Sequence, residues 1–466
     1  MAGFSPQRWR NVVDVMLEKT PGNSKLHRLR IIALQESDFN QNNRLAIGRP
    51  VMHHLEDTKM LPQIQHGSCL AKLCITAVLN KQLQLEITRY QKTPIAYIEN
   101  DATGCYNRIV NPLVLLFLRK IGVPSNIVQS LAETWEHTFH RIKTMYGVSN
   151  AQYQNTLEFF LFGPGQGSTI GPLLWLICFL LIVRSLSLQT PKMNIKSVDQ
   201  KTKVSLRGDA FVDDAGLGCT LDLPVAADDH LVCRTTPLVV VALQELAQQW
   251  ERLLFSTGGD LNPQNCFWFL LSWQWKGRKC TLDTSLTMPA SLHLRAGNNL
   301  STPIEIKWIE PMGSYRTLGV HISPSGSNMG ALAVMTEITL DYAQAITGSH
   351  LNRANILTSL IQHLLPRLRF QMPALSLTEA DCNKLLTPIL KATLPRLHVN
   401  RNTARSIVHG PLLLGGMALP HLFTVQGIDK LHLFLGHLRL GDDTGKLKYK
   451  LTYPMCSFSV APPNFS

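Results

Sequence analysis

The chain has 466 residues, of which 45% are hydrophobic and 17% charged, and its formal net charge is +13. It is too long for one compact core and too apolar for an intrinsically disordered protein, so we expect two or three subdomains. The charge favours a polyanionic partner, and ten scattered cysteines without a Cys-x-x-Cys pair argue against a zinc cluster or a disulfide framework.

The first 93 residues mix short strand-like and helical pieces and lack the apolar core of a signal peptide. They include Lys19 and Arg30, which are candidates for holding a triphosphate, although exposed basic residues are more often simply solvated. Helical periodicity begins after Leu70, with Val78 on an apolar face and Thr76 on the opposite, polar face.

A short buried strand is predicted at 94–98, and it leads to Asp101. Two helices are predicted after it, at 112–118 and 127–135. A glycine-rich turn, Gly163-Pro164-Gly165-Gln166-Gly167, comes next. Such a turn lets the backbone approach another molecule closely, but taken alone an ordinary loop is the more frequent explanation.

Pro172 is placed to open an apolar helix that extends to Ile182. The apolar run stops at Arg184 and is shorter than the roughly 20 residues that a membrane helix needs, so a buried core helix is predicted. Residues 187–205 are interpreted as a solvated connection.

Two adjacent carboxylates, Asp213 and Asp214, follow within an otherwise apolar stretch. Residues 209–212 and 215–218 are predicted to form the two halves of a tight hairpin around them. A pair of aspartates usually marks a surface turn, but apolar neighbours on both sides would hold this pair against a core, where carboxylates are costly without counter-cations.

The remaining chain is predicted to contain a helix at 238–254, a turn at 258–263 and short strands at 292–294 and 304–306. From about residue 340 onward the pattern is helical, and we place a domain boundary near 335. Between residues 345 and 440 there are ten Lys or Arg residues against three acidic ones, which favours contact with phosphates.

The order of a lone aspartate, a glycine turn and an aspartate pair suggests a two-metal site for phosphoryl transfer. Two magnesium ions roughly 3.5–4 Å apart lower the basicity of an attacking hydroxyl and neutralise charge on the phosphate, and they prefer oxygen ligands. If the two strands lie side by side, Asp101 and Asp213 would bridge the ions and Asp214 would assist. This hypothesis requires positions 101 and 213 to converge in space.

Other candidate sites are weaker. Tyr106 lies five residues beyond Asp101 and would sit beneath the sugar of an incoming nucleotide, although a packed core tyrosine is the commoner finding. His137 and His140 lack the glutamate and the spacing of a zinc protease, so a structural role is predicted. The chain has neither a phosphate-binding P-loop motif nor a Gly-x-Ser-x-Gly nucleophile elbow.

The ordered motifs resemble those of reverse transcriptases, in particular the enzymes encoded by non-LTR retrotransposons. Residues 101–106, 163–172 and 211–214 are similar to motifs A, B and C, and residues 258–262 and 316–320 are similar to motifs D and E. The segments around Trp9, Lys19 and 29–34 resemble the fingers motifs, and Gln65-His66-Gly67 resembles the segment before motif A. The resemblance spans roughly residues 5 to 440.

This resemblance implies an α+β right-hand polymerase, with fingers, a palm of antiparallel sheet and helices, and a helical thumb. We expect fingers and the start of the palm at 1–93, the palm with motifs A to E at 94–334, and the thumb with the C-terminal region at 335–466. The implied activity is RNA-directed DNA polymerisation with two Mg²⁺ ions, Mn²⁺ being possible instead.

The site residues implied by the resemblance fall into three groups. Asp101, Asp213 and Asp214 are the catalytic and metal-binding carboxylates. The incoming nucleotide would contact Lys19, Arg30, Tyr106 and Gln166. The Tyr106 ring would exclude nucleotides that carry a ribose 2′ hydroxyl. The template and primer would contact Gly165, Gly167, Leu318 and Gly319.

Three positions depart from the family pattern. Asn107 replaces a second aspartate, Gly171 replaces the common serine before Pro172, and Asn265 stands where a lysine usually protonates the leaving group. Loss of such a general acid costs roughly 10²–10⁴-fold in rate.

The expected partners are an RNA template, a DNA primer or RNA–DNA hybrid, and deoxynucleotides, with no membrane, and a nuclear location follows by family analogy. A catalytically silent nucleic-acid-binding relic and an RNA-dependent RNA polymerase are the alternatives, and Tyr106 disfavours the second. Neither an endonuclease nor a ribonuclease H segment is recognisable, so a truncated element, a domesticated copy or a partial gene is expected.

Overall fold

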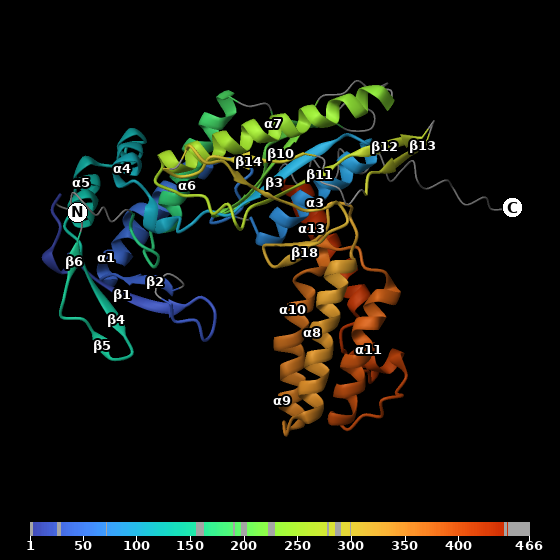
Figure 1. Ribbon diagram of the computed structural model, residues 1–466. Coiled ribbons are helices and arrows are strands. Elements are labelled where there is room, and N and C mark those ends of the chain that lie inside the picture. The colour runs from blue at the N-terminus through green and yellow to red at the C-terminus, as the bar shows by residue number, and fades with distance from the viewer. Residues whose placement is uncertain are drawn as a thin grey trace.

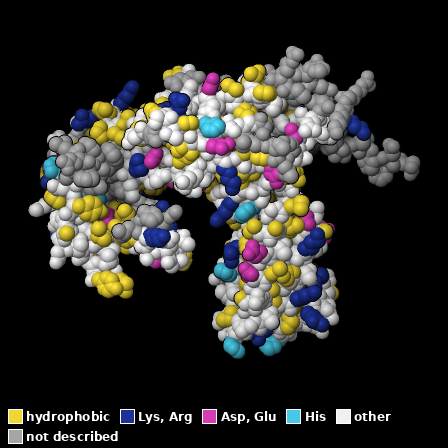
Figure 2. Space-filling model, in the orientation of Figure 1, with side chains coloured by type: hydrophobic (Ala, Val, Ile, Leu, Met, Phe, Trp, Pro, Cys, Tyr) yellow, Lys and Arg dark blue, Asp and Glu magenta, His cyan; other side chains and the backbone are white. Residues whose placement is uncertain are grey.

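The computed structural model describes residues 3–25, 29–70, 72–154, 163–189, 192–196, 203–221, 229–276, 279–284, 290–298, 300–441 and 445. These residues form a mixed α+β fold (Figure 1). An N-terminal arm and a C-terminal helical arm extend in the same direction from a central part that contains a sheet and long helices, and Figure 2 shows an open space between the two arms.

The N-terminal arm is built on a five-stranded sheet in the order β2-β1-β4-β5, with β6 also paired to β4. Its strands are β1 (Asn11–Glu18), β2 (Leu29–Leu34), β4 (Phe139–Thr144), β5 (Gly147–Val148) and β6 (Tyr153–Gln154). Strand β1 pairs with β2 in antiparallel fashion and with β4 in parallel. Strands from 139–154 thus belong to the same sheet as β1 and β2, although they lie outside the range 1–93.

Helices of the N-terminal half contribute their own apolar residues, such as Phe39, Val51, Val114 and Leu131, to one core. They are α1 (Ser37–Asn42), η3 (Asn43–Gly48), α2 (Arg49–Asp57), α4 (Asn111–Lys120) and α5 (Ser125–Glu136). The two predicted helices at 112–118 and 127–135 are thus confirmed as α4 and α5.

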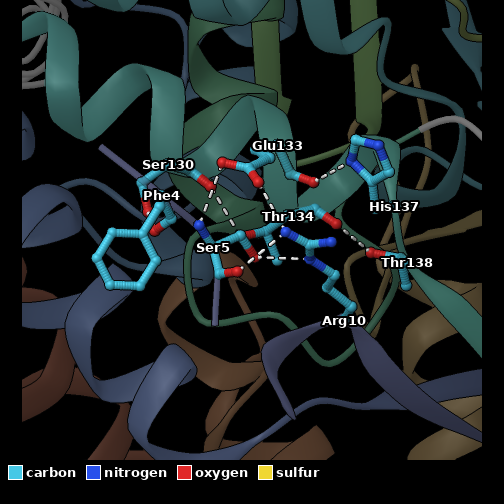
Figure 3. A network of polar contacts seen from close by, with 8 residues as sticks. All are labelled: Phe4, Ser5, Arg10, Ser130, Glu133, Thr134, His137 and Thr138. Atoms are coloured by element: carbon cyan, nitrogen blue, oxygen red, sulfur yellow. Dashed lines mark hydrogen bonds and ion pairs between the residues drawn. The ribbon is translucent and has the colours of Figure 1, made fainter. Parts of the chain in front are cut away.

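A polar network attaches the N-terminal segment, including η1 (Gln7–Arg10), to α5 (Figure 3). The Glu133 carboxylate accepts hydrogen bonds from the Ser5 backbone N–H at 3.2 Å and from the Arg10 guanidinium at 2.7 Å. Ser130 Oγ donates to the Phe4 carbonyl at 2.9 Å. The His137 ring lies 3.0 Å from the Glu133 carbonyl, which agrees with a structural role for this histidine.

The central sheet has the order β16-β11-β3-β10-β9. Its strands are β3 (Ile95–Asn100), β9 (Gly208–Phe211), β10 (Asp214–Thr220), β11 (Phe267–Leu271) and β16 (Lys307–Trp308). Alternate residues of β3 belong to two separate hydrophobic cores. Ala96 and Ile98 lie in the core with α6 (Gly171–Gln189) and α7 (Asp229–Ser256). Ile95 and Tyr97 lie in the core with α3 (Cys74–Gln91). The predicted strand before Asp101 is confirmed, and helices cover both of its faces.

Helix α3 begins at Cys74, and its predicted polar face is wrong. Thr76 and Asn80 are as buried as Val78, with 1% and 5% of their surfaces exposed. Thr76 lies beside His437 and Asn80 beside His66, because α3 is enclosed on more than one side.

Helix α6 is the described segment that is long and apolar enough to cross a membrane, but 67% of residues 171–188 are buried inside the fold. Trp175, Phe179 and Leu186 lie in the core that α6 shares with α7. This burial agrees with the predicted core helix, which extends further than Ile182 and ends at Gln189.

Two further expectations need correction. The predicted solvated connection at 187–205 contains the hairpin of β7 (Met193–Lys196) and β8 (Lys203–Leu206), whose alternate residues Met193 and Val204 are buried. Helix α7 begins at Asp229 rather than at 238, and it contains Pro237.

Small antiparallel hairpins surround the central sheet: β12 (Trp273–Lys276) with β13 (Lys279–Leu282), β14 (His293–Leu294) with β15 (Ile304–Glu305), and β17 (Tyr315–Thr317) with β18 (Val320–Ile322). The second hairpin confirms the two strands predicted near 292 and 304.

The C-terminal arm is helical, as predicted. Its elements are α8 (Met329–Gly348), α9 (Arg353–Thr358), η5 (Ser359–Leu364), α10 (Leu365–Arg369), η6 (Met372–Ala374), α11 (Glu379–Arg396), α12 (Arg405–His409), η7 (Leu412–Leu414) and α13 (Leu422–Leu440). A capping box of Thr378 and Asp381 starts α11. The predicted boundary near 335 falls inside α8, so the helical region begins at Met329 instead.

Candidate active site

The structure brings Asp101, Asp213 and Asp214 together at one edge of the central sheet. Strand β3 pairs with β10 so that Asn100 lies opposite Ala215. Asp101 directly follows Asn100 and Asp214 directly precedes Ala215, so the antiparallel register places these two aspartates on neighbouring strands. Asp213 occupies the turn between β9 and β10, next to the Asp214–Phe211 pair. Residues more than 100 positions apart in the sequence therefore lie at neighbouring strand ends.

The turn that carries Asp213 is strained and firmly held. Val212 has a φ of 59°, which is rare for a β-branched residue. The Gln65 side chain accepts from the Val212 N–H at 2.9 Å and donates to the Val212 carbonyl at 3.2 Å, and Trp175 Nε1 donates to the same carbonyl at 2.6 Å. A Cβ on Gly67 would lie 2.4 Å from the Val212 nitrogen, so only glycine fits there. Gln65 and Gly67 thus position the turn.

Negative charge is in excess around the three carboxylates. Burial, followed by the neighbouring Asp213 and Asp101 carboxylates, raises the pKa of Asp214 to about 6, although the residue as a whole is exposed to solvent. Burial also raises the pKa of Asp213, and the charge of Arg30 opposes that increase. This effect places Arg30 close to the site.

Two asparagine amides hold Asp101. Its Oδ2 atom accepts from Asn265 Nδ2 at 2.6 Å and lies 3.3 Å from Asn262 Nδ2. The Asn262 backbone N–H also donates to the Asp101 carbonyl at 2.9 Å. Asn265 therefore orients a carboxylate in this chain.

The donor set of the site suits a hard divalent cation, because its candidate ligands are carboxylate oxygens. Among the described residues, however, no group of three His, Cys, Asp or Glu side chains is gathered closely enough to hold a metal as it stands.

Tyr106 and Asn107 connect Asp101 to the glycine turn. Tyr106 lies in η4 (Tyr106–Arg108) and is half-buried. A Cβ on Gly171 would lie 3.3 Å from the Tyr106 ring, so the glycine that replaces serine leaves room for this ring. The Asn107 side chain accepts from the Gln166 backbone N–H at 2.7 Å. Two of the departures from the family pattern thus contact motif residues directly.

The glycines of the 163–167 turn are required by contacts within the protein. A Cβ on Gly163 would lie 2.0 Å from the Tyr106 carbonyl oxygen. A Cβ on Gly165 would lie 2.8 Å from the Ala33 side chain, and one on Gly167 would lie 2.6 Å from the Ala33 carbonyl oxygen. The Ala33 N–H donates to the Gln166 carbonyl at 2.7 Å, so the turn is attached to the edge of β2.

The N-terminal sheet presents a basic face near the carboxylates. Arg30 pairs with Leu17, Arg141 with Val13 and Lys143 with Val15, and strand alternation puts all of these side chains on one face. We call this face of β1, β2 and β4 the basic face; it carries exposed Arg30, Arg141 and Lys143 and no acidic residue. Lys19 is exposed just beyond the end of β1.

Leu318 and Gly319 form the two-residue turn between β17 and β18. Both have positive φ values, 49° and 85°, as the tight hairpin requires. The Leu318 carbonyl lies 3.5 Å from Cys74 Sγ, at the start of α3. The turn is therefore fixed to the helix that runs beneath the sheet.

Sequence reasoning missed Lys81, which lies beside the site. Its ammonium is 2.7 Å from Glu99 Oε1, and its charge opposes the rise in the pKa of Asp214. The residue is 4% exposed. A lysine in the middle of an apparently amphipathic helix gives no signal of this location, because the pairing depends on the tertiary fold.

No protein-family model matches the chain, and no curated protein matches it. Among solved structures, telomerase from Candida albicans in complex with a TWJ fragment of telomeric RNA is similar, with a TM-score of 0.37 and 11% identity over 95% of this chain and 65% of that one. Apo telomerase from Candida tropicalis gives a TM-score of 0.37 and 12% identity, covering 95% and 69% of the two chains. The chain thus spans about two thirds of the length of these telomerases, which it resembles at low TM-score and identity.

Proposed function

We propose that this chain is an RNA-directed DNA polymerase of retroelement origin, similar to the non-LTR type, which extends a primer 3′ end with deoxynucleotides. The convergence of Asp101, Asp213 and Asp214 at adjacent strand ends supports this proposal most directly. In a right-hand description, the N-terminal arm would be the fingers, the central sheet the palm and the C-terminal arm the thumb. A nuclear location follows from the same family analogy.

The three carboxylates would hold two Mg²⁺ ions, or Mn²⁺ ions. Bound ions would lower the basicity of the primer 3′ hydroxyl and neutralise charge on the phosphate. The protein's own contribution is positioning: Gln65 and Trp175 hold the Asp213 turn, and Asn262 with Asn265 holds Asp101.

The residues around the carboxylates suit a deoxynucleoside triphosphate. Arg30 is exposed and close enough to affect Asp213, so it would bind phosphate oxygens, with Lys19 at the end of the neighbouring strand. Tyr106 would lie beneath the sugar and exclude a 2′ hydroxyl. Gln166 and the glycines beside it would face the template base pair.

The partner implied by the charge distribution is a nucleic acid. The basic face extends away from Arg30 across β1 to Lys143 on β4, and none of its residues is acidic. A template strand leaving the carboxylate site would meet this face and bind mainly through phosphates, so affinity should fall steeply with salt.

Primer extension on an RNA template tests the proposal, with purified wild-type protein, Asp213→Ala, and Asp341→Ala as a control that removes an exposed carboxylate of α8. We expect Asp213→Ala to abolish extension while leaving salt-sensitive RNA binding within about twofold, since phosphate contacts dominate binding. Asp341→Ala should extend like the wild type. Extension that survives Asp213→Ala would remove the assignment.

A second candidate function is nucleic-acid binding without catalysis. The hydrogen bond from Asn265 to Asp101 favours it, since an amide occupies a carboxylate oxygen that the chemistry would use and the usual lysine is missing. The same assay separates the two functions: RNA binding by the wild type without extension in either Mg²⁺ or Mn²⁺ would identify the silent form. Incorporation of ribonucleotides in preference to deoxynucleotides would identify an RNA-dependent RNA polymerase.

A further inference from the structure

Lys81 of α3 carries a charge in the interior of the molecule. It is 4% exposed, and a buried ammonium is unfavourable unless it is paired and hydrogen-bonded. Its Nζ atom lies 2.7 Å and 2.8 Å from the two carboxylate oxygens of Glu99 and donates to Thr317 Oγ1 at 3.0 Å. The ammonium thus makes two hydrogen bonds, to Glu99 Oε2 and Thr317 Oγ1, and a close ion-pair contact with Glu99 Oε1.

The partners of Lys81 come from two elements that are far apart in the sequence. Glu99 lies in β3, two residues before Asp101, which directly follows the end of the strand. Thr317 is the last residue of β17, directly before the Leu318–Gly319 turn. One ammonium thus connects the strand that leads to Asp101 with the hairpin of β17 and β18.

The rest of α3 supports this connection. Cys74 at the start of α3 lies 3.5 Å from the Leu318 carbonyl, and Arg89 near its end donates to the Ser325 carbonyl just beyond β18. Thr317 is only 8% exposed. The hairpin is therefore held along the length of one helix, and Lys81 is the contact that also reaches the carboxylate strand.

We propose that Lys81 is a positioning residue that fixes the hairpin of β17 and β18 relative to Asp101 and thereby places the primer 3′ end at the carboxylates. This inference rests on the proposed function, since the resemblance assigns the Leu318–Gly319 turn to the primer. Lys81 makes and breaks no bond in the reaction and acts through Thr317. Its charge also balances Glu99, a fourth carboxylate beside the site.

Thr317→Val tests the connection with the smallest change. It keeps the shape of the side chain and the pairing of Lys81 with Glu99, but removes the hydroxyl that accepts from Lys81. Thr317→Ser retains this hydroxyl and is the matched control. We expect Thr317→Val to lower the single-turnover rate of primer extension about tenfold, because small displacements of reacting groups cost up to 10²-fold. The Kd for the primer–template should stay unchanged, and Thr317→Ser should extend like the wild type.

Hydrogen exchange of residues 315–322 gives a readout that does not depend on catalysis. Amides of this hairpin should exchange faster in Thr317→Val than in Thr317→Ser, and by more than amides of the central sheet, which report any loss of overall stability. The double variant Lys81→Met with Glu99→Gln removes both charges without leaving either one buried alone. It should show the same loss of rate as Thr317→Val, and combining all three changes should cause no further loss.

The possible outcomes separate this inference from the proposed function. Wild-type protein that extends a primer, together with Thr317→Val that extends equally fast, would overturn the role of Lys81 and leave the polymerase assignment in place. Wild-type protein without extension would remove the polymerase assignment. In that case the hydrogen-exchange rates of residues 315–322 still test the positioning role of Lys81. Equal rates in Thr317→Val and Thr317→Ser would overturn this role, and faster exchange in Thr317→Val would support it.

Discussion

At the scale of one residue, Asp214 shows how burial beside other carboxylates makes an ionised carboxyl unfavourable. Burial and the adjacent carboxylates raise its pKa from 3.8 to about 6. A carboxyl whose pKa is raised in the folded state stabilises that state below the unfolded pKa, and this contribution is lost as pH rises through the folded pKa. Metal-free protein should therefore lose stability between about pH 4 and pH 6 through this group.

Asp214→Asn should consequently raise the melting temperature of the metal-free protein at pH 8 and change it little at pH 4.5. Because Asp214 is exposed and screened by solvent, the gain at pH 8 should be at most about 1 kcal/mol. Thermal melts in the presence of a chelator measure this difference. A variant that melts below the wild type at pH 8 would contradict the proposed repulsion.

The residues around the carboxylates differ in how far the sequence could reveal them. Asp101, Asp213 and Asp214 were predictable because two short apolar strands lead directly to them. The roles of Asn265 and Lys81 were not, since each depends on a side chain more than ten residues away in the sequence that only the fold brings into contact. Asn107 is similar: its contact with the Gln166 N–H spans 59 positions.

At the scale of one element, the β9–β10 hairpin depends on close contact between two backbones. Gly208 has a φ of 137°, and a Cβ there would lie 1.8 Å from the Gly216 carbonyl oxygen. Gly216 and Gly218 of β10 also leave room for the Tyr97 ring. The strands that carry Asp213 and Asp214 thus have almost no spare space at this position.

We expect Gly208→Ala to destabilise the protein by at least about 3 kcal/mol, because it combines an unfavourable φ with a clash against backbone. Gly122→Ala is the matched control, since Gly122 has a φ of 91° but open space around its Cα. That control should cost only about 1 kcal/mol. Thermal unfolding of both variants checks the difference, and equal losses would show that the backbone clash is relieved without cost.

Elements whose apolar residues form a regular stripe or run were predicted from the sequence. Elements that are buried only because other parts of the fold enclose them were not. Helices α4, α5 and α6 were found from their apolar stripes or runs. The β7–β8 hairpin was missed because each strand has only four residues, in which polar side chains alternate with apolar ones, and this pattern resembles a solvated segment. The polar side of α3 was misplaced because Thr76 and Asn80 find partners inside the protein.

At the scale of the whole molecule, the exposed side chains of Arg30, Arg141 and Lys143 gather on the basic face, where the proposed nucleic acid would bind. Lys143→Glu on the basic face should weaken binding to single-stranded RNA and reduce the slope of log K against log salt by about 0.7 for the lost contact. Lys120→Glu at the end of α4 changes the net charge equally and is the control. Filter binding over a range of salt concentrations measures both slopes. Equal effects of the two variants would show that only net charge matters.

The length and composition predicted a folded protein of several parts, but no feature of the sequence indicated that strands from 139–154 complete the N-terminal sheet. Parallel pairing of β1 with β4 joins positions 128 residues apart, as in Val12 with His140. No local pattern specifies such a pairing, because strand periodicity reports which face is buried and not which strand lies alongside.

This pairing has a consequence for synthesis on the ribosome. Strand β1 is among the first segments to emerge, yet its parallel neighbour emerges only after residue 139. A nascent chain that has reached α4 therefore exposes one edge of β1, and such edges recruit other strands. Fragments that end before residue 139 should for this reason be prone to aggregate, whereas fragments that include residue 154 contain every strand of the sheet.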